Sequence, residues 1–562
     1  MKKIGVLIGE NLMKKEKEQD IIFTIVAIIC VILYAFAISP KTLQNDTFYT
    51  ISIGKYIYEN GISNLTEDVF SWHDLPYTYP HWLYDLGIFL IYNSFGHPGI
   101  YASTIILASI LGIVIYVLCS KLSKNKIVSL IITIGAMYLL KPYIAARAQL
   151  FTFILFGLTV YFIEMFLQKP QKRYALYLII IPIVIANVHC AVFPFYFVLY
   201  LPYIAEYLWI SLIDFDIDKR IEKLFFILVS KIIKRDRIQT RCRENIEKID
   251  YRIFERNRKR VILRNNPYRI IVKKNKYVLL LICILVFATC TGLISPTGTN
   301  AYTYLYKTMI GNTMDSINEH QPMIIVECKE FFGAIFLFLV ILIFTDTKIR
   351  LSDLFMLVGL TYLSLKTKRQ ISMFAIFCAP IMSKLIAAMF EKYDSEAYRK
   401  LMNFAGSCLG ACATILTFAL VSIDLLKPII RDPYVDSSSY PVEASDWMLE
   451  NLDVKKIKLY NEYNYGSYLL FRGIPVFIDS RADLYAPEFN EDKENGILGR
   501  DIFNDALNIA GIAYNYKVAF QDYGVTHVIA YSNSKLAMLL EDDNDYILLY
   551  DKDSFKIFER II

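Results

Sequence analysis

Eleven long apolar segments are the feature that most restricts how this chain can fold. The first of them, residues 21–38, reads IIFTIVAIICVILYAFAI and contains no charged residue. A helix of about 20 apolar residues is long enough to span the hydrocarbon core of a bilayer. The composition agrees, because 55% of the 562 residues are hydrophobic and the mean hydropathy is +0.39. The sequence therefore predicts an α-helical polytopic membrane protein.

A multi-span domain is predicted over residues 1–426. Its first span follows a lysine-rich N-terminus and precedes no small-residue cleavage site, so we interpret it as a signal anchor. The predicted spans lie near residues 20–39, 98–119, 127–144, 148–168, 174–190, 192–212, 277–295, 331–346, 351–365, 371–390 and 403–425.

Basic segments between these spans indicate the orientation. KLSKNK follows the second span, KPQKR separates the fourth from the fifth, and residues 213–276 hold 20 Lys and Arg against 9 Asp and Glu. The positive-inside rule places all of them, with the N-terminus, in the cytoplasm. Residues 82–96 are apolar but short, and counting them as a span would reverse this pattern. We therefore predict that they form a helix along the outer membrane face.

The predicted outer side receives residues 40–97, residues 296–330 and the C-terminal part of the chain. Residues 40–97 are expected to contain interfacial helices. Residues 427–562 are polar and mixed, with short β-like runs such as KIKLYNE, PVFID and THVIAY between helical patterns. This alternation predicts an extracytoplasmic α/β domain.

The basic insertion 213–276 is predicted to be an amphipathic helix on the cytoplasmic surface, where anionic lipid attracts it. Nucleic-acid binding is the alternative. We disfavour it because basic runs beside membrane spans are ordinary topology signals.

Asp46 is the first candidate catalytic residue. It lies shortly after the first span and before a stripe of apolar residues typical of an interfacial helix. A carboxylate at such a boundary is partly desolvated, which suits a general base. The alternative is a solvated or helix-capping aspartate, because NDT before an amphipathic segment is also a capping pattern.

Several cations fall on the predicted outer side, against the positive-inside trend. Lys141 and Arg147 lie between the third and fourth spans, and Lys368 and Arg369 lie between the ninth and tenth. Both turns are short, so these charges must lie at the membrane boundary. They are suited to binding a lipid-linked phosphate, although snorkelling to head groups is an alternative.

Other polar residues are candidate substrate or acceptor contacts. They are Asp68, His81, His189, Glu319, His320, Asp479 and Arg481. Asp479, Arg481 and Asp483 follow the predicted strand PVFI, where α/β sheets commonly present binding groups. A buried Asp–Arg pair that holds a turn is the alternative for these residues. No spacing of His, Asp or Glu residues is diagnostic of a metal site. A divalent cation therefore remains an alternative for which no ligands are assigned.

The layout resembles the GT-C class of membrane glycosyltransferases. The stretches that carry the resemblance are NDTFYTISIGKYIYENGI, EDVFSWHDLPYTYPHWLYDLGIFLIY, ARAQLFTFILF, NVHCAVFPF, ISPTGTNAYTY, INEHQP, KRQISMFAI and NYGSYLL…VFIDSRADLY, in this order. In residues the chain is closest to bacterial members related to the ArnT-, protein-mannosyltransferase- and Rgt-like groups. The resemblance implies that Asp46 is the loop carboxylate that acts as base or metal ligand. It also implies that Arg147 and Arg369 lie where the lipid phosphate is held. No second acid forms a DxD pair with Asp46, which weakens a metal-dependent reading.

These observations lead to an expected function and an alternative. We expect a cell-membrane glycosyltransferase that moves a sugar from a polyprenyl-phosphate donor to a glycan, lipid or protein acceptor of the cell envelope. Its N-terminus would be cytoplasmic, and nucleic acid would not be a partner. The alternative is a non-catalytic membrane protein that binds or transports a lipid-linked glycan.

Overall fold

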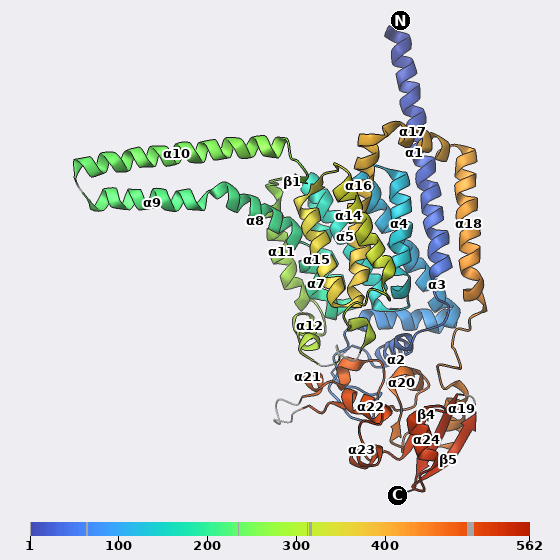
Figure 1. Ribbon diagram of the computed structural model, residues 1–562. Coiled ribbons are helices and arrows are strands. Elements are labelled where there is room, and N and C mark those ends of the chain that lie inside the picture. Colours follow the sequence, from blue (N-terminus) through green and yellow to red (C-terminus); the bar gives the residue numbers. More distant parts are fainter. Residues whose placement is uncertain are drawn as a thin grey trace.

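The structure is a bundle of long helices with a smaller α/β domain at one end (Figure 1). It is a computed structural model that describes residues 2–62, 66–233, 235–311, 313, 317–491, 499–552 and 554–561. The N-terminus and the C-terminal domain lie at opposite ends of the bundle (Figure 1). The α/β fold class of the C-terminal part and the polytopic helical bundle are thus both confirmed.

Every predicted span overlaps helical segments, and the one near residues 192–212 is divided between two helices, α7 (Phe193–Val198) and α8 (Leu201–Phe215). Seven segments are long and apolar enough to cross a membrane, and they include α1 (Lys2–Ile38), α5 (Ala148–Gln168) and α16 (Ile371–Tyr393). The other four predicted spans are helices of 13 to 17 residues. Besides α1, α5 and α16, the helices that form these spans are α3 (Trp82–Ser123), α4 (Lys126–Leu140), α6 (Lys172–Val188), α7, α8, α11 (Tyr277–Thr289), α14 (Lys329–Phe344), α15 (Leu351–Lys366) and α18 (Cys408–Arg431).

Helix α16 is the centre of the bundle. It packs against α3, α4, α5 and α15, and most of its side chains are buried. Around it the buried side chains of the spans form one apolar cluster. Many apolar side chains on the outside of the bundle are exposed, as a bilayer requires. The protein is thus a multi-pass membrane protein.

A sharp bend divides α3 into two parts. Gly96 has φ 61° and ψ −155°, a conformation that a residue with a Cβ atom rarely adopts. The part before Gly96 lies across the end of the bundle, and the part after it runs along the bundle (Figure 1). The structure therefore agrees with the prediction that residues 82–96 do not span.

Helix α2 (Asn45–Asn60) is buried between this transverse part of α3 and the C-terminal helix α20 (Tyr463–Phe471). Gly54 permits the close approach, because a Cβ atom there would lie 2.1 Å from the carbonyl oxygen of Asp85. The sequence predicted an interfacial helix with one apolar face. In the structure, α2 has buried residues on most of its circumference, because protein covers it on both sides.

The C-terminal domain is built on a four-stranded sheet in the order β3-β4-β6-β5. Strand β3 is parallel to β4, and the other neighbours are antiparallel. The strands are β3 (Leu459–Tyr460), β4 (His527–Tyr531), β5 (Tyr546–Lys552) and β6 (Phe555–Arg560). The domain's helices are α19 (Val442–Asn451), α20, α21 (Pro487–Asn490), α22 (Ile502–Ala510), α23 (Tyr516–Tyr523) and α24 (Lys535–Glu541). Short elements elsewhere are α12 (Asn300–Ile310), α17 (Ser395–Ala405) and the pair β1 (Ile270–Ile271) and β2 (Ile349–Arg350).

The segment PVFI is not a strand of this sheet, contrary to the sequence prediction. Only Val476 pairs as an isolated bridge, with Ser71 of the outer loop. The side chain of Asn461 accepts a hydrogen bond from the backbone N–H of Phe477 and donates one to the carbonyl of Ile478. These contacts replace the ladder hydrogen bonds of a strand, which lets a polar backbone stay buried.

A buried ion triad joins the outer loop to the C-terminal domain. The Arg481 guanidinium donates to Asp68 of the loop at 2.7 Å and to both carboxylate oxygens of Asp479 at 2.8 and 2.6 Å. The Tyr485 hydroxyl also donates to Asp479. All three charged side chains are at most 2% exposed. The triad therefore matches the structural alternative for Asp479 and Arg481, because their charges are directed at each other and at Asp68.

Loss of the triad's cation is expected to destabilise the protein strongly. Arg481→Met leaves two buried carboxylates without a partner, a change that typically costs about 3–5 kcal/mol. The measurement is the unfolding temperature of the purified protein in detergent. Arg472→Met is the matched control, because Arg472 pairs with the half-exposed Asp446 on the surface of the same domain. Equal decreases for the two variants would show that the triad is not a main support of the fold.

Candidate active site

Two basic turns meet at the end of the bundle that carries the C-terminal domain. One is the 3₁₀ turn Lys141–Tyr143 with the following Arg147, and the other is the 3₁₀ turn Lys368–Gln370. The Tyr143 hydroxyl donates a hydrogen bond of 2.5 Å to the carbonyl of Lys368. Charges from two turns more than 200 residues apart in sequence are thus brought together.

Asp46 forms an ion pair with Arg147 in this cluster. Its Oδ2 lies 2.8 Å from the guanidinium of Arg147, and the other amino group of that guanidinium contacts Glu319 Oε1 at 3.2 Å. Gln44, not Asp46, occupies the N-cap of α2, and Asp46 lies in the first helical turn. The capping alternative for Asp46 is therefore excluded. The first turn also favours a negative charge, because the helix dipole is positive there.

Arg369 is the second guanidinium of the cluster. Its Nη1 donates to the Nε2 atom of His320 at 3.3 Å. Among the described residues, no carboxylate forms a salt bridge with Arg369, although it is partly buried. A buried cation without an anionic partner is unfavourable, so this position is suited to an external anion.

The other two predicted phosphate-binding cations lie at the edge of the cluster. Lys368 pairs with Glu327 at 2.5 Å and donates to Asn318 at 2.9 Å. Lys141 is exposed at the start of its turn. Arg147 and Arg369 are therefore the cations best placed to act together.

Two histidines lie beside the arginines. The rings of His81 and His189 are 4.8 Å apart, and His189 Nδ1 is 3.0 Å from the hydroxyl of Thr152. Burial and the charges of Arg147 and Arg369 lower the pKa of His81 to about 3. Burial, His81 and the same two arginines also lower the pKa of His189 well below its usual value. Both rings are therefore neutral at neutral pH, and the cluster carries its positive charge on the arginines.

Glu319 and His320 come from the loop between α12 and α14, and both predicted residues reach the cluster. Burial opposes ionisation of Glu319, but the charges of Arg147 and Arg369 outweigh it and lower the pKa of this carboxyl. Burial and Arg369 lower the pKa of His320 to about 4. Neutral His320 can accept the hydrogen bond from Arg369, which protonated His320 could not.

Asp483 is a site residue that the sequence prediction did not select. It follows the ion triad by two residues on the turn Ala482–Tyr485 and accepts a hydrogen bond from Thr308 at 3.3 Å. Burial raises the pKa of its carboxyl, while hydrogen bonds from Tyr304 and Thr308 and the charge of Arg369 act in the opposite direction. The run DSRADLY contains both Asp479 and Asp483, and the sequence alone does not show which of the two belongs to the triad.

No set of metal ligands is evident in the described part of the chain. There, no three His, Cys, Asp or Glu side chains are grouped as a metal site would require. The two carboxylates nearest to Arg147 are both paired with it, so the cluster is better suited to an anion.

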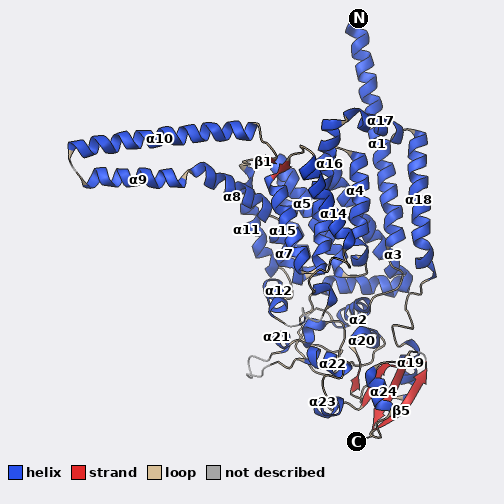
Figure 2. Ribbon diagram, viewed as in Figure 1, coloured by secondary structure: helices blue, strands red, loops and turns tan. Residues whose placement is uncertain are grey.

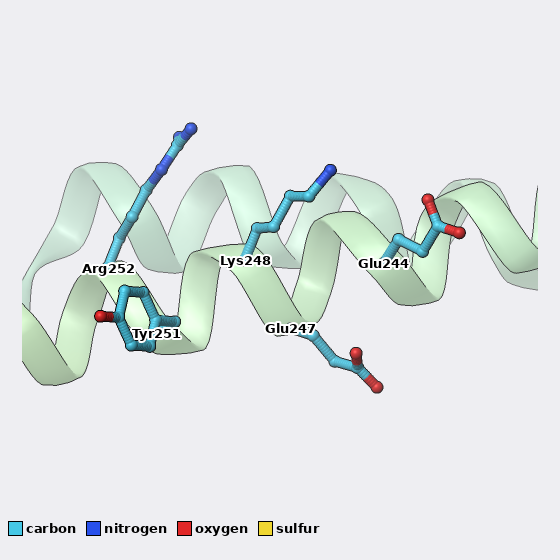
Figure 3. A pocket seen from close by; sticks show the side chains of 5 residues that line it. All are labelled: Glu244, Glu247, Lys248, Tyr251 and Arg252. Carbon is cyan, nitrogen blue, oxygen red and sulfur yellow. The ribbon is translucent and has the colours of Figure 1, made fainter.

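A separate hollow lies far from this cluster, on the long helix α10 (Asp236–Asn265). Its lining side chains are Glu244, Glu247, Lys248, Tyr251 and Arg252 (Figure 3). They point in different directions and do not converge on a common point (Figure 3). This hollow is therefore not the functional site.

Comparison with solved structures shows the fold. The oligosaccharyltransferase of Archaeoglobus fulgidus in the apo form aligns with 91% of this chain and 69% of its own, at 12% identity and a TM-score of 0.51. The chain therefore shares the fold of this enzyme. The same enzyme tethered to an acceptor peptide gives a TM-score of 0.49 at 12% identity, covering 91% of this chain and 69% of its own. With an inhibitory peptide and dolichol-phosphate it gives 0.46 at 13% identity, covering 96% and 74%. No family model and no curated protein matches this sequence.

The neutral histidines predict how the stability of the folded protein changes with pH. The folded pKa of His81 and of His320 lies below the unfolded value of about 6.5, so the unfolded chain binds more protons below that value. The stability that these groups contribute is present above about pH 6.5 and is lost as the pH falls toward 4. We expect the unfolding temperature in detergent to fall between pH 7 and pH 5.

A double variant tests the origin of this decrease. His81→Gln with His320→Gln is expected to weaken the dependence on pH, because neither glutamine can be protonated. His527→Gln in the C-terminal domain is the comparison, since burial lowers the pKa of His527 without a contribution from either arginine, and its effect on the pH dependence should be smaller. An unchanged pH dependence in the double variant would contradict the assignment.

Proposed function

We propose that this protein is a membrane glycosyltransferase that uses a polyprenyl-phosphate-linked sugar as donor. The observation that carries the proposal is the pair Arg147 and Arg369 at the membrane boundary, of which Arg369 has no carboxylate partner among the described residues. A phosphate group attached to a lipid would arrive at this depth with its chain in the bilayer. The GT-C fold and the oligosaccharyltransferase that shares it support the same reaction class.

Asp46 is the proposed general base. Its carboxylate removes the proton of an acceptor hydroxyl, whose oxygen attacks the anomeric carbon of the sugar. The bond between that carbon and the phosphate oxygen breaks, and the phosphate leaves with the electron pair. Arg147 and Arg369 stabilise the negative charge that grows on the leaving phosphate, and Lys368 adds to the field. This reaction needs no nucleotide.

The ion pair between Asp46 and Arg147 suggests how donor binding prepares the base. In the structure, Arg147 is shared between Asp46 and Glu319. A phosphate that binds the same guanidinium competes with Asp46 and leaves its oxygens free to accept a proton. The base would thus become available when the donor is in place, which limits side reactions in the empty site.

The acceptor is proposed to reach the site beside the C-terminal domain. Asp46 on α2 faces that domain, as Asn45 next to it donates a hydrogen bond to the carbonyl of Tyr463 on α20. Asp483 of the same domain comes close to Arg369. We place this end outside the cytoplasm, with the N-terminus inside, in line with the distribution of basic loops. The acceptor is a glycan, lipid or protein of the cell envelope.

Asp46→Asn is expected to reduce sugar transfer by about 10²–10⁴-fold, the usual contribution of a general base. Asparagine keeps the shape and can still accept a hydrogen bond from Arg147, so the fold should persist. The measurement is loss of labelled sugar from a polyprenyl-phosphate donor, with a membrane extract as the source of acceptor. Glu59→Gln is the control, because Glu59 lies on the same helix and is 56% exposed. Undiminished transfer by Asp46→Asn would remove Asp46 as the base.

Arg369→Gln is expected to weaken use of the donor by about 10- to 100-fold, because a charge-assisted hydrogen bond contributes about 1.5–3 kcal/mol. Arg369→Lys should retain part of the activity, since the positive charge remains. Lys366→Gln is the control on the neighbouring exposed position. The comparison is made by varying the donor concentration at a fixed acceptor level. If the two glutamine variants behave alike, Arg369 does not bind the donor.

A further inference from the structure

The helical hairpin of α9 (Ile217–Ile232) and α10 projects sideways from the bundle (Figures 1 and 2). It lies at the end of the bundle where the N-terminus is, and its helices run roughly perpendicular to the spans (Figure 1). Ion pairs connect its two helices and their base, namely Lys223–Asp250 at 2.6 Å, Arg256–Asp218 at 2.9 Å, Arg260–Asp216 at 2.6 Å and Arg264–Asp214 at 2.5 Å. The hairpin is therefore held together along its length and has a defined face.

One face of α9 is a continuous apolar stripe. It consists of Ile217, Ile221, Leu224, Phe225, Leu228 and Ile232, whose side chains are 44–77% exposed. At 100° per residue these positions lie on one side of the helix, and the residues that pair within the hairpin, such as Lys219 and Lys223, lie on the other. In water such a stripe would be an exposed apolar patch, which soluble surfaces rarely carry.

The stripe faces the side on which the bilayer lies. In Figure 1, α10 is level with the ends of the spans, and α9 lies on the side of α10 that is nearer to the C-terminal domain. The stripe lies on the side of α9 that is opposite to α10. It therefore faces the space beside the bundle that lipid would fill, and not the side where the N-terminus lies. Beyond the left-handed turn at Asp216, Leu208, Trp209 and Leu212 of α8 add further apolar side chains that are 50–57% exposed. Tryptophan at this position is typical of a membrane interface.

We propose that the hairpin lies in the surface of the lipid leaflet on the N-terminal side. Helix α9 is immersed between head groups and acyl chains through its apolar stripe, and α10 covers it from the aqueous side. The hairpin is expected to attract anionic lipid, because residues 213–276 carry 20 Lys and Arg against 9 Asp and Glu. Basic side chains without an ion pair among the described residues include Lys231, Arg237, Arg241, Arg243, Arg258 and Lys259.

The positive charge of the hairpin and the position of its apolar stripe both favour an anionic lipid surface as its partner. The axis of α10 lies about one helix diameter, roughly 10–12 Å, above α9. This separation is comparable with the Debye length of roughly 8–10 Å, so the basic residues of α10 still attract anionic head groups. Anionic lipids would therefore gather beneath the hairpin. A nucleic acid could bind the basic face of α10 but would leave the apolar stripe of α9 in water. The lipid surface accounts for both features at once.

The first test measures depth with a tryptophan placed on each face. Phe225→Trp puts the probe in the stripe, and Tyr251→Trp puts it on the outer face of α10, where Tyr251 is 64% exposed. The full chain is reconstituted in vesicles of phosphatidylcholine and phosphatidylglycerol with brominated acyl chains. After subtraction of the parent signal, the probe at 225 should be quenched several-fold more than the probe at 251. Equal and weak quenching at both positions overturns the proposal.

The second test examines the lipid charge. Bromine is carried either by phosphatidylglycerol or by phosphatidylcholine at the same mole fraction, and quenching of the probe at 225 is compared. Enrichment of anionic lipid predicts stronger quenching by the brominated phosphatidylglycerol, and the difference should disappear at 1 M salt, where the Debye length is about 3 Å. A variant with Arg241→Gln, Arg243→Gln and Lys259→Gln should show a smaller difference. Identical quenching by both lipids at low salt overturns the role of anionic lipid.

Discussion

The ion triad of Asp68, Arg481 and Asp479 is the interaction on which the arrangement of the outer face depends. It connects a loop between the first two long spans with a turn more than 400 residues later in the chain. Because all three charges are buried, any shift of the loop against the domain would separate charges in a medium of low dielectric constant. The same turn continues into Asp483, so the triad also helps to position that carboxyl, which feels the charge of Arg369. Helix α2 is enclosed by this assembly, which positions Asp46.

The candidate site differs from the triad in how its charges are balanced. In the triad one cation serves two carboxylates and no polar atom of Arg481 is left for a ligand. In the site, Arg147 pairs with Asp46 and Glu319, whereas Arg369 forms no salt bridge among the described residues. Burial and the arginines keep His81 and His320 neutral, so they add no positive charge. All charges of the triad pair with one another, which supports the fold, whereas Arg369 is left for an external anion.

Much of the site was predictable because the membrane reduces the number of arrangements. Once the spans and the basic loops define two sides, Asp46, Arg147 and Arg369 must lie at the same boundary, and the structure brings these three together. Glu319, His320, His81 and His189 also reach the cluster. Lys141 and Lys368 share the boundary, but rotation about the turn decides which side chains point inward. That rotation depends on contacts such as the hydrogen bond from Tyr143 to Lys368, which sequence spacing does not encode.

The predictions that failed concern local structure within the outer face. PVFI has the composition of a strand, but Asn461 satisfies its backbone and removes the need for a partner strand. The apolar stripe of α2 indicated a membrane surface, whereas the C-terminal domain covers it. An apolar stripe shows only that one face of a helix avoids water. Either lipid or another part of the protein can cover that face.

The sequence by itself determined that the chain spans a membrane many times and that two groups of cations lie at one membrane boundary. These properties follow from the length of apolar runs and from the placement of charge, which are local or additive along the chain. Only the tertiary structure decided which charges neutralise one another. A salt bridge depends on separations of a few ångströms between distant segments. For that reason Asp479 and Arg481 became a support of the fold, while Arg369 was left facing the site.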